Sequence, residues 1–426
     1  MPLFSERTRI VHLLRRAGFD ASRAEREHYF ALGLEGTIDA LLNYEQAPDP
    51  VEDRIAGMTF DLGKVQEVSR WWFVRMVGTG RPLQEKMTLF WHGHLTSAAH
   101  KVTRADLMLG QNQFFRANAL APFDRIMKGI TRDPAMLTWL DNRSNVKTAP
   151  NENYARELME LFTMGVGNYS ERDVKEAARA LTGMGIRRDG TYVFNVRLHD
   201  DGAKTFLGQT GPFGADDIID IICRQAVTPS FLSRKLFEFF AHEKPTDADI
   251  GPMVQAYWDS GYSVRDMMRA LFRSEAFYSD ASYRQHVKGP TEHVAGAFRL
   301  LGIVPDDKLS PRGPQLIAGM GQRLLDPPDP SGWDEGAAWI STGNLLQRVN
   351  LGATLAPLPG ADAAAAPETT TDAKSILDAA LDLLVDGAVS ADTRSLLTAE
   401  VTATPAALRK KRALQLIMGL PEFQFA

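Results

Sequence analysis

The chain has 426 residues and a formal net charge of −5 at pH 7, with 44% hydrophobic and 24% charged residues. This balance is typical of a globular protein and excludes a disordered or fibrous chain. The negative net charge gives no electrostatic reason to expect nucleic acid or an anionic membrane as a partner. Because Cys223 is the single cysteine, an intrachain disulfide and a Cys-rich metal cluster are also excluded.

The N-terminus reads MPLFSERTRIVHLL, and it meets charge at Glu6, Arg7 and Arg9 before an apolar run can form. It therefore lacks the apolar region of a signal peptide. No stretch approaches the ~18 consecutive apolar residues of a membrane-spanning helix. The sequence predicts a cytoplasmic protein without a membrane partner.

Helical periodicity dominates the chain. In residues 81–100, one stripe at three- and four-residue spacing contains Leu83, Met87, Phe90, Trp91 and His94. Similar amphipathic stretches run through residues 9–17, 35–44, 62–78, 104–120, 152–164, 214–226, 228–242, 252–260, 263–273 and 285–301. The pattern predicts a mainly α protein, a multi-helix globular bundle.

One helix is predicted with both of its ends. Ser170 is a good N-cap, and Asp173 lies three residues later at the positive end of the helix dipole. Gly183 is suited to a C-terminal stop. The predicted buried stripe between them is Val174, Ala177, Ala178 and Leu181.

Strand patterns are scarce. The one small β-hairpin is predicted near residues 186–198, where Asp189-Gly190 supplies the turn and apolar residues alternate after it. The segment LDPPDPSGWDEGAAW, residues 325–339, has too many prolines and glycines for a helix or a strand. We expect an ordered loop there, anchored by Trp333 and Trp339.

The predicted domain organisation has three parts. Residues 1–352 form the main helical domain, with a possible sub-boundary near 200–212. Residues 353–374 are rich in Ala, Pro and Thr with little to bury, which predicts a flexible linker. Residues 375–426 are expected to form two or three helices that pack back on the main domain.

Several segments closely resemble one bacterial family, catalogued as "domain of unknown function 1800". They are RRAGF near residue 15, FWHGHLTS at 90–97, PNENYARELMELFTMGVGNYSERDVKEAARALTG at 150–183, HDDGAKTFLG at 199–208, SRKLFEFF at 233–240, VKGPTEHV at 287–294, GQRLLDPPDPSGW at 321–333, WISTGNLLQRVN at 339–350 and the closing LPEFQF. They follow the family's order over nearly the whole chain. Two departures are Gly93, where many relatives have Asn, and Met184, where they usually have Trp.

The resemblance implies an uncharacterised protein, because the family has no settled activity. Many members are encoded beside secreted sulfatase-like proteins, so the resemblance suggests a sulfatase-like partner by analogy alone. It also implies that paired histidines at residues 92 and 94 are a feature of the family's motif. Many relatives look exported, and this chain does not.

His92-Gly93-His94 is the first candidate site. Two imidazoles one residue apart can chelate one metal ion when the backbone is extended or at a helix end, whereas in a regular helix they point about 200° apart. Gly93 makes a local break plausible. Imidazole suits several divalent transition metals, so the spacing does not name the ion. The plainer interpretation is a pair of histidines that pack and form hydrogen bonds.

The second candidate is the helix that begins near residue 151. Glu157 and Glu160 share one face and could reach one ion. Free backbone N–H groups at the start of a helix favour anions and polar ligands. The plainer interpretation is a capped helix with a surface ion pair between Arg156 and Glu160. The polar residues predicted to bind a cofactor or ligand at this start are Asn151, Glu152 and Asn153.

The third candidate is His199-Asp200-Asp201-Gly202-Ala203-Lys204, directly after the predicted hairpin. His199 and Asp200 could act as a general base or complete a metal shell, and Lys204 could stabilise negative charge. A solvated turn is the plainer interpretation. HExxH, GxSxG, GxxxxGK[ST] and strand-linked GxGxxG motifs are all absent from the sequence.

These clusters lead to one hypothesis, that folding gathers them around a common pocket. The leading function is a metal-dependent enzyme, a hydrolase or an oxidase, acting on an unidentified small molecule or polymer. Its metal ligands would be His92, His94, Glu157 and Glu160, and its catalytic residues His199, Asp200 and Lys204. The alternatives are a non-catalytic interaction or scaffold protein and a carbohydrate- or polymer-binding protein, since amides and tryptophans serve carbohydrates well.

Overall fold

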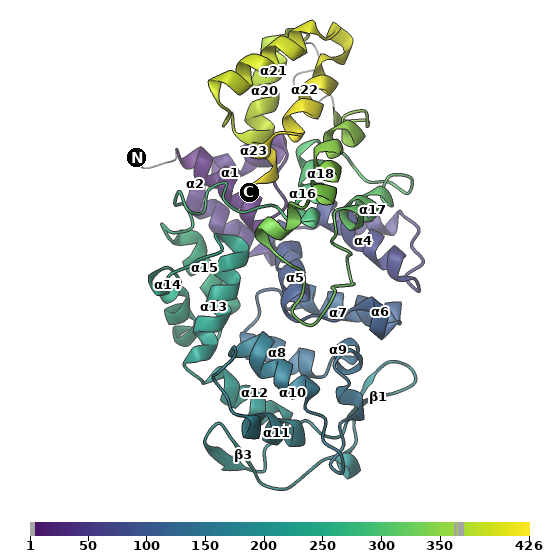
Figure 1. The fold of residues 1–426 in the computed structure, drawn as a ribbon, viewed down its shortest axis with the longest axis vertical. Coiled ribbons are helices and arrows are strands. Elements are labelled where there is room, and N and C mark those ends of the chain that lie inside the picture. Colours follow the sequence, from purple (N-terminus) through teal and green to yellow (C-terminus); the bar gives the residue numbers. More distant parts are fainter. Residues whose placement is uncertain (1–4, 362–363, 365–369) are drawn as a thin grey trace.

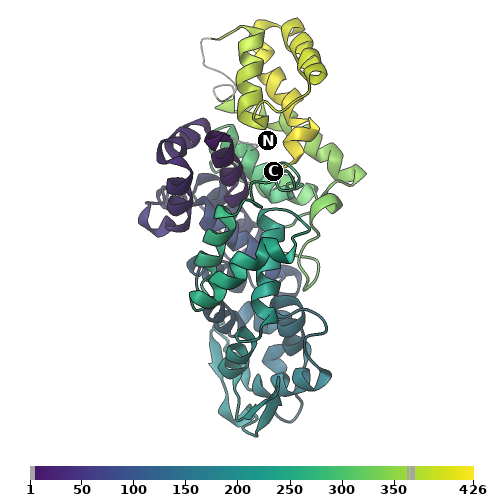
Figure 2. The same ribbon diagram turned by 90° about the vertical axis from the view of Figure 1, so that its left-hand side faces the viewer.

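The computed structural model describes residues 5–361, 364 and 370–426. The protein is elongated and built almost entirely of helices, which stack along its long axis (Figures 1 and 2). The prediction of a mainly α protein with a small hairpin is confirmed. No helix in the described part of the chain is long and apolar enough to cross a membrane.

The N-terminal third surrounds a central helix, α5. Its helices are α1 (Glu6–Ala17), α2 (Arg23–Leu42), α3 (Val51–Ala56), α4 (Val65–Gly78), α5 (Pro82–His94), α6 (Ala99–Val102) and α7 (Ala105–Ala117). Pro82 starts α5, where a missing N–H costs nothing. In the predicted stripe Leu83, Met87, Phe90 and Trp91 are buried and His94 is half-buried. Trp91 donates from Nε1 to the carbonyl of Ala119. Apolar burial therefore holds α5 in the middle of the molecule (Figure 1).

The next helices form the lower end in Figure 1. They are α8 (Phe123–Thr131), α9 (Pro134–Trp139), α10 (Asn153–Glu157), a π-helical turn (Leu158–Thr163), α11 (Glu171–Ala180) and α12 (Ala215–Cys223). In α11 the Ser170 side chain accepts from the backbone N–H of Asp173, as its spacing predicts. The predicted stripe of this helix is buried, and Gly183 has a positive φ of 84°. This helix was predictable because its caps and its stripe agree.

Two hairpins lie at the same end. Strand β1 (Met184–Ile186) pairs antiparallel with β2 (Tyr192–Phe194), close to the predicted position. A second hairpin pairs β3 (Lys204–Phe206) with β4 (Gln209–Gly211), so the prediction of a single hairpin was incomplete. Its turn consists of Leu207 and Gly208, both with positive φ. A leucine in this conformation is uncommon, which is why the turn was missed.

The second half of the chain returns to α5. It comprises α13 (Val227–Phe240), α14 (Asp247–Asp259), α15 (Val264–Arg273), α16 (Pro290–Leu300), α17 (Arg312–Gly319) and α18 (Thr342–Leu355), followed by α20 (Ala373–Val385), α21 (Ala391–Ala403), α22 (Arg409–Met418) and α23 (Pro421–Gln424). Residues 325–339 are irregular apart from a 3-10 turn at Gly336–Trp339. Trp339 is buried and Trp333 half-buried, as an anchored loop requires.

The segment predicted as a linker, 353–374, begins inside helix α18. Its first residues complete α18, and Leu355, Ala356 and Ala361 are buried. These three apolar side chains are packed against other parts of the protein. The division of the chain at a linker stays a prediction. Part of the predicted segment, 362–363 and 365–369, lies outside the described residues.

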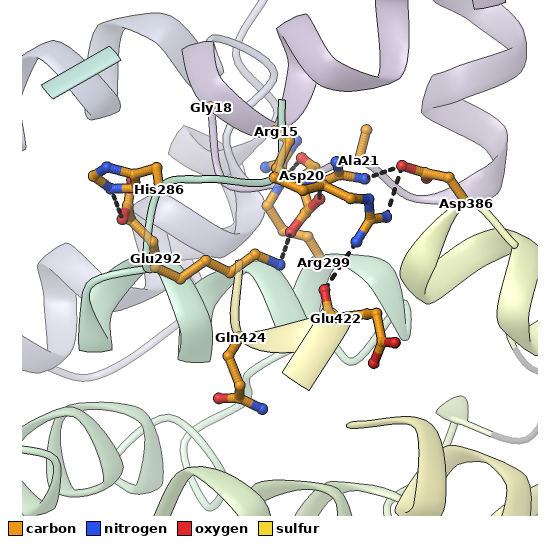
Figure 3. A network of polar contacts seen from close by, with 12 residues as sticks. Arg15, Gly18, Asp20, Ala21, His286, Glu292, Arg299, Asp386, Glu422 and Gln424 are labelled. Atoms are coloured by element: carbon orange, nitrogen blue, oxygen red, sulfur yellow. Dashed lines mark hydrogen bonds and ion pairs between the residues drawn. The ribbon is translucent and has the colours of Figure 1, made fainter. Parts of the chain in front are cut away.

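The C-terminal helices are joined to the main body by polar contacts. Asp386, after α20, forms ion pairs with Arg15 at 2.6 Å and with Arg284 at 2.8 Å. Near the C-terminus, Val287 pairs with Phe425 in an isolated β-bridge. Figure 3 shows how Arg15 and Asp386 reach toward each other from the two ends of the chain.

Candidate functional site

A cavity of about 300 Å³ lies against the C-terminal half of α5. Its walls come from α5, the π-helical turn, α13, the segment before α16 and residues 330–339. A cavity of this size suits a small molecule. Polar groups among its lining residues are His94, Glu160, Lys235, Glu238, His286, Glu292, Gln322, Asp334 and Glu335.

His94 lines this cavity and stacks on Phe90 with an interplanar angle of 13°. Burial, and next the charge of Lys235, lower the pKa of His94 to about 3, so the ring is neutral at pH 7. Its Nε2 lies 3.0 Å from the carbonyl oxygen of Phe162. A carbonyl only accepts, so Nε2 carries the proton and Nδ1 keeps a lone pair. His94 can therefore offer the cavity one nitrogen acceptor.

His92 lies on another face of the same helix. Its ring meets Trp72 and Trp333 edge-on, with ring centroids 5.5 and 5.3 Å apart. Burial lowers its pKa to about 3. Because α5 stays helical through His94, the structure does not turn the two imidazoles toward one ion. The local break that Gly93 allows is not used.

Instead, the loop of residues 330–339 packs against the backbone of Gly93. A β-carbon on Gly332 would lie 2.3 Å from the carbonyl oxygen of Gly93, so the two backbones are in direct contact. Thr96 adds a 2.8 Å hydrogen bond from its Oγ1 to the carbonyl of Pro330. The loop is thereby fixed against α5, and this places Trp333, Asp334 and Glu335 at the cavity.

Glu160 reaches the cavity from the π-helical turn and accepts a 2.6 Å hydrogen bond from the hydroxyl of Tyr169. Single π-helical turns occur frequently at functional sites. Glu157 is not among the lining residues; burial, and next the charge of Glu160, raise its pKa. The predicted pair between Arg156 and Glu160 does not form, because Arg156 pairs with other carboxylates, Glu152 and Glu171.

The polar residues 151–153 do not line the cavity. The Oδ1 of Asn151 accepts from the backbone N–H of Asn153, whose side chain donates to the carbonyl of Leu140. Glu152 forms a 3.4 Å ion pair with Arg156. These amides complete the loop before α10 and hold it to the end of α9. Their cofactor-binding role stays a prediction.

The third cluster lies among the hairpins, away from the lining residues of the cavity. Nδ1 of His199 lies 2.9 Å from the carbonyl oxygen of Thr182, and Asp200 forms a 2.7 Å ion pair with Arg179. Lys204 is buried and donates to the carbonyls of Asp200 and Gly202. Their contacts join the β3–β4 hairpin to α11, and a catalytic role for them stays a prediction.

Glu292 lines the cavity and was missed as a site residue; Figure 3 shows it in contact with His286. It accepts from Lys86, from the backbone N–H of Gly289 at 2.7 Å and from Nε2 of His286 at 3.2 Å. Burial alone raises the pKa of Glu292, but the charge of Lys86, the contact with His286 and the charge of Arg16 together outweigh it and hold that pKa well below its ordinary value. Glu292 is therefore a fixed anion.

The pKa of Glu335 is shifted in the opposite direction from that of Glu292. The Glu335 side chain is exposed and lines the cavity, and within the described residues its carboxylate has no hydrogen-bond partner. Crowding by protein atoms, together with the charges of Glu238, Glu292 and Glu243, raises its pKa to about 7, although Lys235 opposes the shift. Glu335 therefore exchanges its proton near neutrality, which is unusual for a carboxyl group.

A comparison with protein families identifies the family of this chain. A family model described as "Protein of unknown function (DUF1800)" matches residues 12–425. The chain belongs to this family. No curated protein and no solved structure gives a match. Most of the segments by which the sequence resembles DUF1800 contribute to the cavity: 90–97, 150–183, 233–240, 287–294, 321–333 and 339–350.

The convergence predicted from sequence is thus partial in this DUF1800 chain. His94 and Glu160 share the cavity, while His92, Glu157, the amides and the third cluster do not line it. Across residues 5–361, 364 and 370–426, no three His, Cys, Asp or Glu side chains are grouped so that they could hold a metal ion. The four-ligand metal site stays a prediction that this geometry does not support.

The sequence contains only weak indications that Glu292 and Glu335 belong to a site. Glu292 is the third residue of a helix that begins with Pro290, a position at which Glu commonly caps the helix. Glu335 follows a tryptophan in a loop rich in proline and glycine. A charged residue in a loop that large aromatics hold in place is a usable signal, since ordered loops often carry function.

Proposed function

We propose that this protein is an acid–base enzyme, a hydrolase that acts on a small polar molecule in the cavity. The observation that carries the proposal is the Glu335 carboxyl group, which is accessible, unpaired and has a pKa of about 7. Catalytic acids and bases work best when their pKa lies near the working pH. The pKa of Glu292 is low while that of Glu335 is high. Two carboxyl groups with opposite pKa shifts in one site are typical of an acid–base pair.

In this proposal, ionised Glu335 acts as the general base. It takes one proton from a water molecule while the water oxygen forms a bond to the electrophilic carbon or phosphorus of the substrate. The bond to the leaving group then breaks, and protonated Glu335 returns the proton to that group. The sum is one water consumed per bond broken, with no redox change. Glu292 keeps its charge throughout because Lys86 compensates it.

The surroundings support this assignment. The loop that carries Glu335 is fixed to α5 through Gly332 and Thr96, and helix α13 forms another wall of the cavity. Aromatic side chains, Phe90, Phe231, Phe239, Trp333 and Trp339, form part of the cavity wall. A fixed geometry favours proton transfer by a positioned side chain.

The direct test is Glu335→Gln, which removes the titrating group and keeps its shape. Purified protein is screened for hydrolysis of chromogenic esters, amides, glycosides and phosphates between pH 5 and 9. We expect kcat/KM to rise with an apparent pKa near 7, and the variant to lose about 10²–10⁴-fold. Glu275→Gln, an exposed carboxylate that pairs with Arg9, is the matched control.

Two results would contradict the proposal. One is hydrolysis with the same rate and pH profile in the Glu335→Gln variant as in the wild type. The other is independent of the substrate: carbon-13 NMR of labelled glutamate carboxyls, assigned by the same variant, that places the pKa of Glu335 near 4.5. A complete absence of turnover across all four substrate classes also argues against a hydrolase.

Metal dependence is a second proposal, and the state of His94 favours it. A histidine that donates one N–H to a backbone carbonyl presents its other nitrogen as metal-binding histidines do. Glu160 lies at the same cavity. Since no third protein ligand is grouped with them in the described chain, a divalent transition metal would take its other ligands from water or substrate. Metal analysis of untagged protein tests this, with His94→Ala losing the ion and His92→Ala keeping it.

The rival functions make different predictions. A carbohydrate-binding protein would use Trp333 and Trp339 as stacking surfaces, and glycans would raise its Tm without turnover. A scaffold protein would tolerate Glu335→Gln and every other substitution within the cavity. The sulfatase-like partner and the cytoplasmic location stay predictions.

A further inference from the structure

The cavity has an excess of negative charge. Glu160, Glu238, Asp334 and Glu335 line it without a compensating network like that of Glu292. The one cation among the lining residues is Lys235, whose Nζ lies 3.8 Å from Glu238. One loose ion pair cannot neutralise these groups, although Glu335 is about half protonated at pH 7. Repulsion among such groups in a partly dry site is unfavourable until a positive charge enters it.

An independent observation points the same way. His286 lines the cavity and is 6% exposed, and its Nδ1 has no hydrogen-bond partner in the described structure. The Nε2 atom lies 3.2 Å from Glu292, which is ionised and can only accept, so Nε2 holds the proton. Nδ1 therefore has a free lone pair. A buried acceptor without a partner is costly, and a ligand that donates would satisfy it.

The cavity also offers aromatic surface to a cation. Phe90, Phe231, Phe239, Trp333 and Trp339 all contribute to its lining. One ammonium group already lies beside this aromatic wall, since Nζ of Lys86 is 5.4 Å from the ring centre of Phe239. Aromatic faces attract ammonium groups through the ring quadrupole, most strongly where water is excluded.

We propose that the substrate carries a protonated amino group, an ammonium that the carboxylates of Glu238 and Asp334 hold beside the aromatic wall of the cavity. This inference rests on the proposed function and names its substrate class. A neutral, hydroxyl-rich molecule would use the same acceptors, but it would leave the negative charge of the cavity uncompensated. An anionic substrate would meet repulsion from the same groups.

The ionisation of Glu335 adds a pH dependence. The charged groups around it are Lys235, Glu238 and Glu243 from α13 and the residues after it, Glu292 from α16 and Arg16 from α1. A cation binds more tightly when Glu335 is ionised, so amine affinity rises as pH increases through about 7. Glu335→Gln removes that rise and leaves the binding itself in place.

The experiment is isothermal titration calorimetry with three probes of equal chain length: 1,4-diaminobutane, butane-1,4-diol and succinate. We expect the diamine to bind at least about ten-fold more tightly than the diol, and succinate not to bind. The Glu238→Gln/Asp334→Asn variant should lose most of this preference. Asp247→Asn, which removes an exposed carboxylate outside the cavity, is the matched control. Circular dichroism confirms that both variants are folded.

Equal or tighter binding of the diol overturns the proposal, as does millimolar diamine without a heat of binding. An unchanged preference in the Glu238→Gln/Asp334→Asn variant overturns it too. These outcomes are separable from failure of the acid–base mechanism. If amines bind but Glu335→Gln turns over normally, only the mechanism fails; if Glu335→Gln stops turnover but neutral substrates are preferred, only the substrate class fails.

Discussion

The backbone of Gly332 lies directly against the carbonyl oxygen of Gly93, with 2.3 Å between that oxygen and the position a β-carbon on Gly332 would take. This contact joins the loop that carries Glu335 to the helix that carries His94. Gly332 also has a φ of 98°, which L side chains rarely adopt. One glycine therefore sets the distance between two walls of the cavity.

Gly332→Ala is expected to lower the free energy of unfolding by about 2 kcal/mol or more and to displace the loop. Gly167→Ala is the matched control, because Gly167 has a φ of 86° but open space where its β-carbon would lie. Gly167→Ala therefore introduces backbone strain alone, whereas Gly332→Ala introduces strain and a steric clash with Gly93. Urea denaturation of both variants measures the difference, and equal losses would show that the contact with Gly93 is unimportant.

The buried pair of Lys86 and Glu292 should be strongly coupled. Lys86 is fully buried and also donates to the carbonyl of Gly18 at 3.1 Å. Lys86→Met leaves a buried anion without its cation, so we expect a loss of about 3–5 kcal/mol. Lys86→Met/Glu292→Leu removes both charges and should recover much of that loss.

A double-mutant cycle from denaturation curves measures this coupling. Lys64→Met, on an exposed pair with Asp61, should leave the denaturation midpoint unchanged. Additive losses in the cycle would mean that Glu292 is held by its other partners, His286 and Gly289, rather than by Lys86.

Asp386→Asn should loosen the C-terminal helices. Burial alone raises the pKa of Asp386, but Arg15, Arg284 and Arg26 lower it far below the ordinary value. Removal of its charge takes the carboxylate partner from Arg284 and one of two from Arg15, which keeps Asp20 at 3.2 Å, at a cost of about 3–5 kcal/mol. Asparagine tolerates the left-handed backbone at this position (φ 53°), so the substitution tests charge and not conformation.

Limited proteolysis is the measurement for this prediction. Faster cleavage near residues 370–372 is expected in Asp386→Asn. The exposed pair of Asp378 and Arg394 provides the control, because Asp378→Asn should have little effect. Identical cleavage rates in the two variants would show that apolar packing alone holds the C-terminal helices.

His92 should make the protein less stable in acid. Its pKa falls from 6.5 in the unfolded chain to about 3 in the folded protein, because burial disfavours the charged ring. Its contribution is therefore complete above pH 6.5 and is lost as pH falls toward 3, by about 1.4 kcal/mol per pH unit. His92→Phe should reduce the slope of unfolding free energy against pH between 6.5 and 4.5.

His28→Gln is the control for that slope, since His28 is exposed. Denaturant titrations at half-unit pH intervals give the comparison. If the His92→Phe slope equals that of the wild type, then His92 is not the neutral, buried ring described above.

Local patterns in the sequence were sufficient for the helical class and for particular elements. Ser170, Asp173 and Gly183 predicted both ends of α11, because caps act over three or four residues. Asp189-Gly190 predicted the β1–β2 turn for the same reason. The β3–β4 hairpin was missed because Leu207 has a positive φ, a backbone conformation that leucine rarely adopts and that a leucine in the sequence therefore does not predict.

The candidate site was only half predictable. Sequence reasoning reached His94 and Glu160, since polar residues on helix faces stand out, and it grouped them with His92, Glu157 and His199, which lie elsewhere. It missed Glu292 and Glu335. Their properties come from Lys86, Lys235 and Glu238, neighbours from other elements, and such proximity has no periodic signature.

By itself, then, the sequence determined the family, the helical class and the local caps and turns, all of which depend on residues close together in the chain. The tertiary structure alone decided which side chains share the cavity and what charge they carry. The physical reason is that burial and long-range charge pairs set the pKa of a carboxyl group. Both depend on packing between elements far apart in sequence, as Lys86 and Glu292 illustrate.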